Sequence, residues 1–194
     1  MIPPPTIVVP GGDFFLGALP QDKFANTTEL PRRRVEVASF AMGVHPVTNG
    51  AWAAFAPGHT GDSWRLPTEI EWEYACRAGS ETLFPQGDDL TPADANFLFD
   101  ESIERVGPGG VTPVGTYPPN RWGFHDLLGN VNEWTASPWA QTHETDASIV
   151  PGSFTIRGGS WDGLPRLLRP SWRDGMEAGA RGDHLGFRVA SSKG

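Results

Sequence analysis

The chain has 194 residues and carries 15 lysines and arginines against 23 aspartates and glutamates, a formal net charge of −8. This length suits one globular domain over residues 1–194, and the acidic balance gives no electrostatic basis for binding a nucleic acid. No apolar stretch approaches the ~18 residues of a membrane helix, and residues 1–12 lack the charged start and apolar core of a signal peptide, which predicts a cytoplasmic protein with no membrane partner.

The composition predicts a loop-rich domain held by large aromatic side chains. It includes 24 glycines and 19 prolines together with eight tryptophans and eleven phenylalanines. Glycine and proline end regular structure, whereas a buried aromatic ring removes ~150–250 Å² from water. The single cysteine, Cys76, excludes an intramolecular disulfide and a zinc site built on several cysteines of this chain.

Strand signals come first along the chain. Thr6–Val9 and Asp13–Gly17 flank the sequence Pro-Gly-Gly at 10–12, which predicts a short β-hairpin. Arg34–Val37 alternates polar and apolar residues, as a half-buried strand does, and we expect it to pair with these strands.

Two short helices are predicted next. Thr48 or Asn49 can cap a helix over 50–56. A second helix, over 67–78, begins with a capping box at 68–71 and carries two aromatic stripes, so we expect it to be buried on more than one side. Within this helix, Glu73 and Arg77 have the i, i+4 spacing of an ion pair.

After residue 79 the chain loses helical periodicity. Glycine and proline turns recur, and short strands are predicted at Val111–Val114, Thr155–Arg157 and Gly186–Ala190. The fold class is therefore α+β, with helices early and strands and loops late.

Six ordered groups of residues match one family. They are Phe40–Gly43 with Pro46–Asn49, Arg65–Ala75, Pro118–Asn120 with Gly123, Gly129–Trp134, Arg157–Trp161, and Gly186–Arg188. The sequence resembles the formylglycine-generating enzyme (sulfatase-modifying factor) family. The resemblance implies a C-type-lectin-like α+β fold that is poor in regular secondary structure.

The resemblance does not extend to the catalytic cysteines. Family members that oxidise a substrate cysteine bind copper through two cysteines shortly after the Gly-Gly-Ser motif. The segment after Ser160 has no cysteine here, and neither Gly163 nor Leu168 can replace a thiolate ligand. We therefore expect no copper and no formylglycine-generating activity, and we interpret Cys76 as a core residue.

A metal-dependent oxidoreductase remains the alternative function. A related branch of the family contains iron enzymes of ergothioneine-type synthesis, in which the iron-binding histidines belong to a separate helical domain. The five histidines of this chain are scattered, without the spacing of a metal triad: His45, His59, His125, His143 and His184. An accessory domain that a partner completes is a further form of this alternative.

The resemblance also implies a calcium site around the Gly-Asn-x-x-Glu segment. The matching positions are Asp126, Gly129, Val131 and Glu133. Side-chain and carbonyl oxygens at close spacing suit Ca²⁺. The alternative is a turn in which Asp126 and Glu133 only accept backbone N–H bonds.

The segment from Trp161 to Leu185, the candidate surface, carries the leading functional hypothesis. In C-type-lectin-like proteins diversified by retroelements, this C-terminal region is the hypervariable ligand-binding face. Four arginines in it match framework positions of the family: Arg166, Arg169, Arg173 and Arg181. The candidate ligand-binding residues are Asp162, Gly163, Leu164, Leu167, Trp172, Asp174, Met176, Glu177 and His184.

These residues predict a non-catalytic module that recognises a ligand, most simply a protein. Exposed Leu164, Trp172 and Met176 beside acidic residues would form an amphipathic patch that anchors a protein partner. The alternative is an ordinary loop in which Leu167 and Trp172 are buried.

Overall fold

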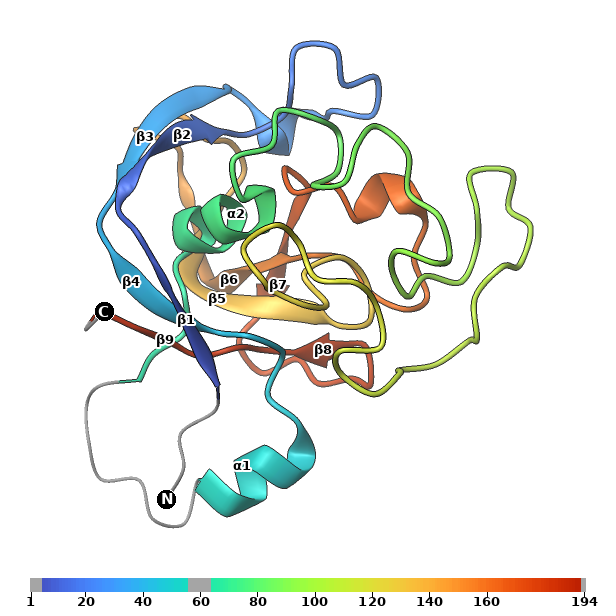
Figure 1. The fold of residues 1–194 in the computed structure, drawn as a ribbon. Helices are drawn as coiled ribbons and strands as arrows, with labels where there is room; N and C mark the ends of the chain where they lie inside the picture. Colours follow the sequence, from blue (N-terminus) through green and yellow to red (C-terminus); the bar gives the residue numbers. More distant parts are fainter. Residues whose placement is uncertain (1–4, 56–63, 193–194) are drawn as a thin grey trace.

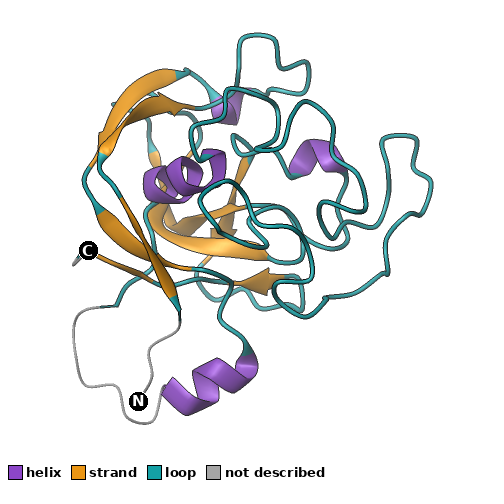
Figure 2. Cartoon of the chain, in the orientation of Figure 1, coloured by secondary structure: helices purple, strands orange, loops and turns teal. Residues whose placement is uncertain are grey.

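The computed structural model describes residues 5–55 and 64–192. Loops and turns connect short helices and strands throughout this part of the chain (Figure 1, Figure 2). The strands are β1 (Thr6–Val9), β2 (Gly12–Leu16), β3 (Arg33–Val37), β4 (Phe40–Gly43), β5 (Asn132–Ala140), β6 (Ile149–Arg157), β7 (Arg173–Glu177), β8 (Leu185–Gly186) and β9 (Ala190–Ser191). The helices are α1 (Asn49–Phe55), α2 (Glu69–Arg77) and the 3₁₀ turns η1 (Thr27–Glu29) and η3 (Pro165–Leu167). The predicted loop-rich α+β class is confirmed.

The predicted hairpin between the first two strands is wrong. β1 pairs with β4 and β2 pairs with β3, both antiparallel. The register continues across the break, because Val9 lies opposite Phe40 and Gly12 opposite Val37. The Pro-Gly sequence is therefore a bend in one long strand. At Gly11 a Cβ atom would lie 3.0 Å from the Val37 carbonyl oxygen, so the two bent strands touch where a turn was expected.

A four-stranded sheet in the order β7-β6-β5-β8 forms the second half of the fold. The predicted strand Thr155–Arg157 lies inside β6, and the prediction over 186–190 covers part of β8 and β9. β9 pairs with β4, which returns the C-terminal end of the chain to the N-terminal sheet (Figure 1). No strand forms at 111–114 because the Asn130 side chain, in place of a neighbouring strand, bonds the backbone of Thr112.

Helix α2 lies in the centre and contacts β2, β3, β5 and β6 (Figure 1). The predicted capping box is confirmed, since Thr68 and Glu71 each accept a hydrogen bond from the other's backbone N–H. Trp72 and Cys76 are fully buried, and burial raises the pKa of the Cys76 thiol to about 12, so the prediction of a core cysteine is confirmed.

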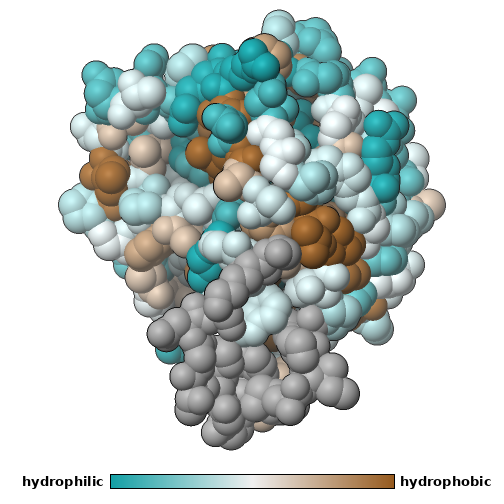
Figure 3. Space-filling model, turned by 60° about the vertical axis from the view of Figure 1, so that its left-hand side comes forward, coloured by the Kyte–Doolittle hydropathy of each residue, from teal (hydrophilic) through white to brown (hydrophobic). Residues whose placement is uncertain are grey.

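Helix α1 begins at Asn49, one residue before the predicted start, and Thr48 is its cap, because the Thr48 hydroxyl accepts a hydrogen bond from the N–H of Ala51. Its predicted last residue, Ala56, lies outside the described residues. None of the described helices has the length and apolar character needed to cross a membrane. On the face shown in Figure 3, apolar side chains form separate small patches among polar ones.

Candidate functional site

Buried arginines hold the backbone of the candidate surface. Among the described residues, five arginines are at least nine-tenths buried: Arg77, Arg157, Arg169, Arg173 and Arg188. A buried charge is tolerated only where an opposite charge and hydrogen-bond partners compensate its lost hydration. Each of the five pairs with a carboxylate, and we call this set the arginine framework.

Glu73 of α2 lies fully buried between two of these arginines, Arg77 and Arg157. Its Oε1 is 2.8 Å from Arg77 Nη2 and accepts a hydrogen bond from the N–H of Gly17 at 3.0 Å. Burial alone would raise the pKa of Glu73, but the two guanidinium groups, together with His143 and the N–H of Gly17, hold that pKa below its usual value. The predicted pair of Glu73 and Arg77 is confirmed, as part of a buried network.

Arg157, at the end of β6, also holds the backbone of the candidate surface directly. Its guanidinium donates to the carbonyl oxygens of Pro170, Ser171 and Trp172 at 2.8, 3.0 and 2.7 Å. Three consecutive carbonyls are thus bound to one rigid group. The backbone at 170–172 is therefore fixed from the core side.

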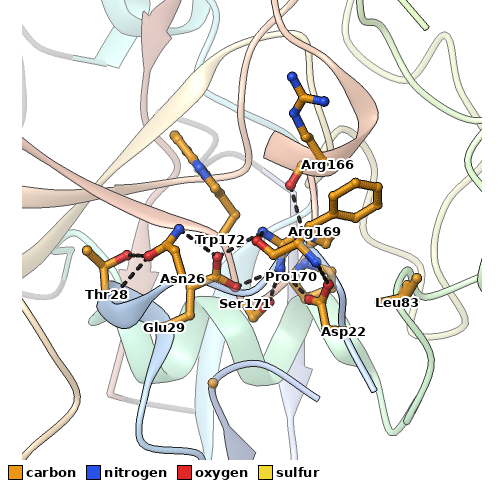
Figure 4. A network of polar contacts seen from close by, with 12 residues as sticks. Asp22, Asn26, Thr28, Glu29, Leu83, Arg166, Arg169, Pro170, Ser171 and Trp172 are labelled. Carbon is orange, nitrogen blue, oxygen red and sulfur yellow. Dashed lines mark hydrogen bonds and ion pairs between the residues drawn. The ribbon is translucent and has the colours of Figure 1, made fainter. Parts of the chain in front are cut away.

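Arg169 ties the same segment to the loop between β2 and β3 (Figure 4). Its two terminal nitrogens donate to both oxygens of Glu29 at 2.7 and 2.8 Å and one of them also pairs with Asp22, while its Nε donates to the Arg166 carbonyl at 2.7 Å. This fork-to-fork geometry orients both partners.

Arg173 completes the contacts on β7. Its Nε and Nη2 donate to Glu69 at 2.9 and 3.0 Å, and its guanidinium lies 4.5 Å from the centre of the Trp139 ring. Of the expected framework positions, Arg169 and Arg173 are therefore buried. Arg166 is half-buried and Arg181 is exposed, so neither belongs to the framework.

The residues of the implied calcium site are engaged in other contacts. Both oxygens of Glu133 accept hydrogen bonds from Arg188 at 2.6 Å, and Oε2 also accepts one from Trp72 at 2.9 Å. Asp126 accepts a hydrogen bond from the N–H of Gly115 at 2.7 Å, and its other oxygen is buried without a hydrogen-bond partner. A cation at Glu133 would compete with Arg188, so the residues fit calcium poorly at that end.

Asp126 matches the stated alternative of a carboxylate that accepts a backbone N–H bond, whereas Glu133 accepts its bonds from side chains. Calcium stays a prediction. Gly129 and Val131 lie in the turn between the two acids, where Gly129 has a φ of +73° and a Cβ atom would lie 2.2 Å from the Asn96 carbonyl oxygen. Among the described residues, no group of three or more His, Cys, Asp or Glu side chains could hold a metal ion.

The structure distributes the candidate ligand-binding residues over three places. Residues 162–167 surround η3, and Trp172 directly precedes β7, which carries Asp174, Met176 and Glu177. His184 precedes β8, at the opposite edge of the same sheet. Two strands, β6 and β5, therefore separate the edge beside His184 from the β7 residues.

Leu164, Trp172 and Met176 are half-buried, which lies between the exposed patch and the buried loop considered above, and the amphipathic patch stays a prediction. Arg157 holds the backbone at 170–172 against the core, and Leu167 packs against the core cluster. Of the candidate ligand-binding residues, the exposed ones are acidic: Asp162, Asp174 and Glu177. The exposed candidate residues therefore present negative charge, and exposed Arg181 adds one positive charge to the same segment.

The loop at residues 98–107 lies beside the candidate surface, and the sequence analysis missed it. The N–H of Phe99 donates to the Gly163 carbonyl at 3.4 Å. The two oxygens of Glu101 accept hydrogen bonds from the backbone and side chain of Arg166 at 2.8 and 2.9 Å. In Figure 1 this lime-coloured loop projects at the right, next to η3. Its acidic run at 100–104 was the available signal.

A loop-rich α+β domain whose C-terminal segment is fixed by buried arginines defines the class of protein. The sulfatase-modifying factor enzyme 1-like domain model matches residues 2–63 and 58–193, and the chain belongs to this formylglycine-generating enzyme family. It is 35% identical over 164 residues to the formylglycine-generating enzyme of Mus musculus, an alignment covering 76% of this chain and 44% of that protein. It is 39% identical over 142 residues to the inactive C-alpha-formylglycine-generating enzyme 2 of Bos taurus, covering 67% and 44%.

Solved structures share the fold. PvdO from Pseudomonas aeruginosa has a TM-score of 0.82 at 26% identity, over 97% of this chain and 94% of that chain. Treponema denticola variable protein 1 has a TM-score of 0.78 at 18% identity, over 96% and 94%. The predicted C-type-lectin-like fold is confirmed. The chain spans less than half the length of the two curated relatives named above.

Proposed function

We propose that this protein is a non-catalytic recognition module that binds a protein ligand through the candidate surface. The observation that carries the proposal is the arginine framework. Arg157 and Arg169 hold the backbone at 166–172 through buried contacts, while the side chains of Asp162, Asp174 and Glu177 point to solvent. Such an arrangement separates the residues that stabilise the fold from the residues that meet a ligand.

The chemistry of the chain supports a role without catalysis. Cys76 is fully buried, and with its thiol pKa raised to about 12 it is neither a nucleophile nor an accessible thiolate at neutral pH. The segment after Ser160 offers no second cysteine. Active enzymes and an inactive relative both occur among the similar proteins, so family membership is compatible with the loss of activity.

The likeness to Treponema denticola variable protein 1 supports a more specific form of the proposal. In that form the exposed positions of the candidate surface change from copy to copy, as in proteins diversified by a retroelement, and the framework stays constant. Calcium bound near Asp126 would be a structural cofactor of such a module.

Affinity capture from the source cells tests the proposal. The triple variant Asp162→Asn, Asp174→Asn, Glu177→Gln removes three exposed charges, and we expect it to lose a partner that the wild-type protein retains. Its free energy of unfolding should change by less than about 1 kcal/mol, because surface substitutions are individually small. The matched control is Glu36→Gln, an exposed acid on β3.

Two results would contradict the proposal. One is equal capture of the same partners by the wild type, the triple variant and the control. The other is stoichiometric iron or copper in protein purified without chelator, which would favour the alternative of a metal-dependent oxidoreductase.

A further inference from the structure

The loop at residues 98–107, which we call the acidic loop, is closed at its base by its own backbone. The N–H groups of Val106 and Gly107 both donate to the Leu98 carbonyl, at 2.8 and 3.1 Å. At Gly107 a Cβ atom would lie 1.9 Å from the Phe97 carbonyl oxygen, so only glycine fits at this position. The two ends of the loop are therefore held together at its base.

The tip of the acidic loop is braced by Asp100. The N–H of Asp100 donates to the Glu104 carbonyl at 3.0 Å, and its carboxylate accepts hydrogen bonds from the N–H groups of Ser102 and Glu104 at 2.8 and 3.0 Å. The N–H of Ile103 donates back to the Asp100 carbonyl at 3.0 Å. These contacts order the tip before any partner binds, which lowers the entropy cost of binding.

Ile103 lies at this tip with an unfavourable backbone conformation and an exposed apolar side chain. Its φ is +66°, in the left-handed region that β-branched residues rarely adopt, and 59% of its surface is exposed. Folding therefore gains little from this side chain and bears its strain. Strained exposed residues of this kind occur where the side chain serves an interaction.

Charges around the tip are mainly negative. Glu104 is exposed beside Ile103, and Asp100 is half-buried. Arg166 offsets Glu101, and Arg105 turns toward the base of the loop, where its Nη2 donates to the Pro108 carbonyl at 3.3 Å. An apolar side chain within a negative rim is complementary to an apolar socket within a positive rim.

We infer that the acidic loop is a preformed recognition element that inserts Ile103 into an apolar socket, rimmed by lysine or arginine, on a protein partner. The inference rests on the proposed function, because the loop adjoins residues 163–166 of the candidate surface. The inference adds to the proposed function the chemical character of the partner's binding site, an apolar socket with a basic rim.

A stability measurement tests the strain. Ile103→Asn places a residue that tolerates the left-handed conformation at the tip, and we expect an unchanged or higher thermal midpoint. The matched control is Ile149→Asn, because Ile149 is 60% exposed on β6, outside the positive-φ region. A midpoint that falls by several degrees for Ile103→Asn alone would mean that Ile103 stabilises the fold, and would overturn the inference.

A binding measurement tests the partner chemistry, with a phage-displayed library of random 12-residue peptides as the probe. We expect the wild-type protein to select peptides that combine an aliphatic or aromatic residue with nearby lysine or arginine. Their dissociation constants should rise at least tenfold for Ile103→Asn and several-fold for Glu104→Gln, and stay unchanged for Ile149→Asn.

The outcomes separate this inference from the proposed function. Selected peptides that bind Ile103→Asn as tightly as the wild type, or a selection that yields no Ile103-dependent peptide, overturn the inference. Peptides that depend only on Asp174 and Glu177 overturn it as well, but leave the proposed function standing. If the peptides depend on Ile103 and the triple variant still captures the partner, the role of the acidic loop is supported. The role of Asp162, Asp174 and Glu177 in binding is then contradicted.

Discussion

Replacing Glu73 by glutamine is expected to destabilise the protein by ~3–5 kcal/mol, a large fraction of the ~5–15 kcal/mol by which domains are stable. The substitution keeps the shape of the side chain but leaves Arg77 and Arg157 buried without their shared countercharge. Because Arg157 also holds the carbonyls at 170–172, the loss should loosen the candidate surface. Urea unfolding followed by tryptophan fluorescence measures the change.

Asp13→Asn is the matched control for this experiment. Asp13 forms an ion pair with Arg34 on the surface, where both side chains are largely solvent-exposed. Exposed pairs contribute ~0–1 kcal/mol, so the control should unfold nearly as the wild type does. A loss of less than about 1 kcal/mol for Glu73→Gln would mean that the buried network does not carry the stability assigned to it.

Acid should destabilise the protein through His143, beginning below pH 6.5. This side chain is 4% exposed, its Nε2 has no hydrogen-bond partner, and burial together with nearby Arg173 lowers its pKa from 6.5 to about 3. The unfolded state thus binds one more proton than the folded state between these values. The free energy of unfolding is therefore unaffected by His143 above pH 6.5 and decreases progressively as the pH falls toward 3.

A shift of this size corresponds to about 4–5 kcal/mol over the full window. The pKa of Glu73 is also below its usual value, but that carboxyl contributes only below its unfolded pKa of 4.5. Between pH 6.5 and 5 the slope therefore reports mainly His143, with a smaller part from His45, whose pKa burial also lowers. We expect His143→Gln to flatten the slope in this range and His45→Asn, a change at a half-buried histidine, to leave most of it. An unchanged slope in His143→Gln would contradict the assignment.

Local signals in the sequence predicted the parts of the fold that depend on neighbouring residues. The capping box at Thr68 and Glu71 determines where α2 begins, and the aromatic stripes of the helix indicate burial on several sides. The segment after Gly-Gly-Ser has no cysteine, which is likewise visible without any distant contact, and the absence of copper stays a prediction. These features need no knowledge of distant contacts.

The features that the sequence did not predict share a different cause, since each depends on residues far apart in the chain. The Pro-Gly segment has the pattern of a turn, and only the pairing of Gly12 with Val37 shows that it is a bend. The constraint on the backbone at Trp172 comes from Arg157, fifteen positions earlier, which binds its carbonyl. The position of the acidic loop beside the candidate surface is shown only by the contact of Glu101 with Arg166, 65 positions away. Sequence patterns of period 2 or 3.6 carry no information on such pairs.

The central claim is that the arginine framework fixes the backbone while the exposed positions of the candidate surface are free to change. Two displayed libraries, scored by resistance to protease, test it most directly. One randomises Asp162, Asp174 and Glu177, and the other randomises Arg157, Arg169 and Arg173. The claim predicts that most members of the first library remain folded and that very few of the second do. Equal folded fractions in the two libraries would contradict it.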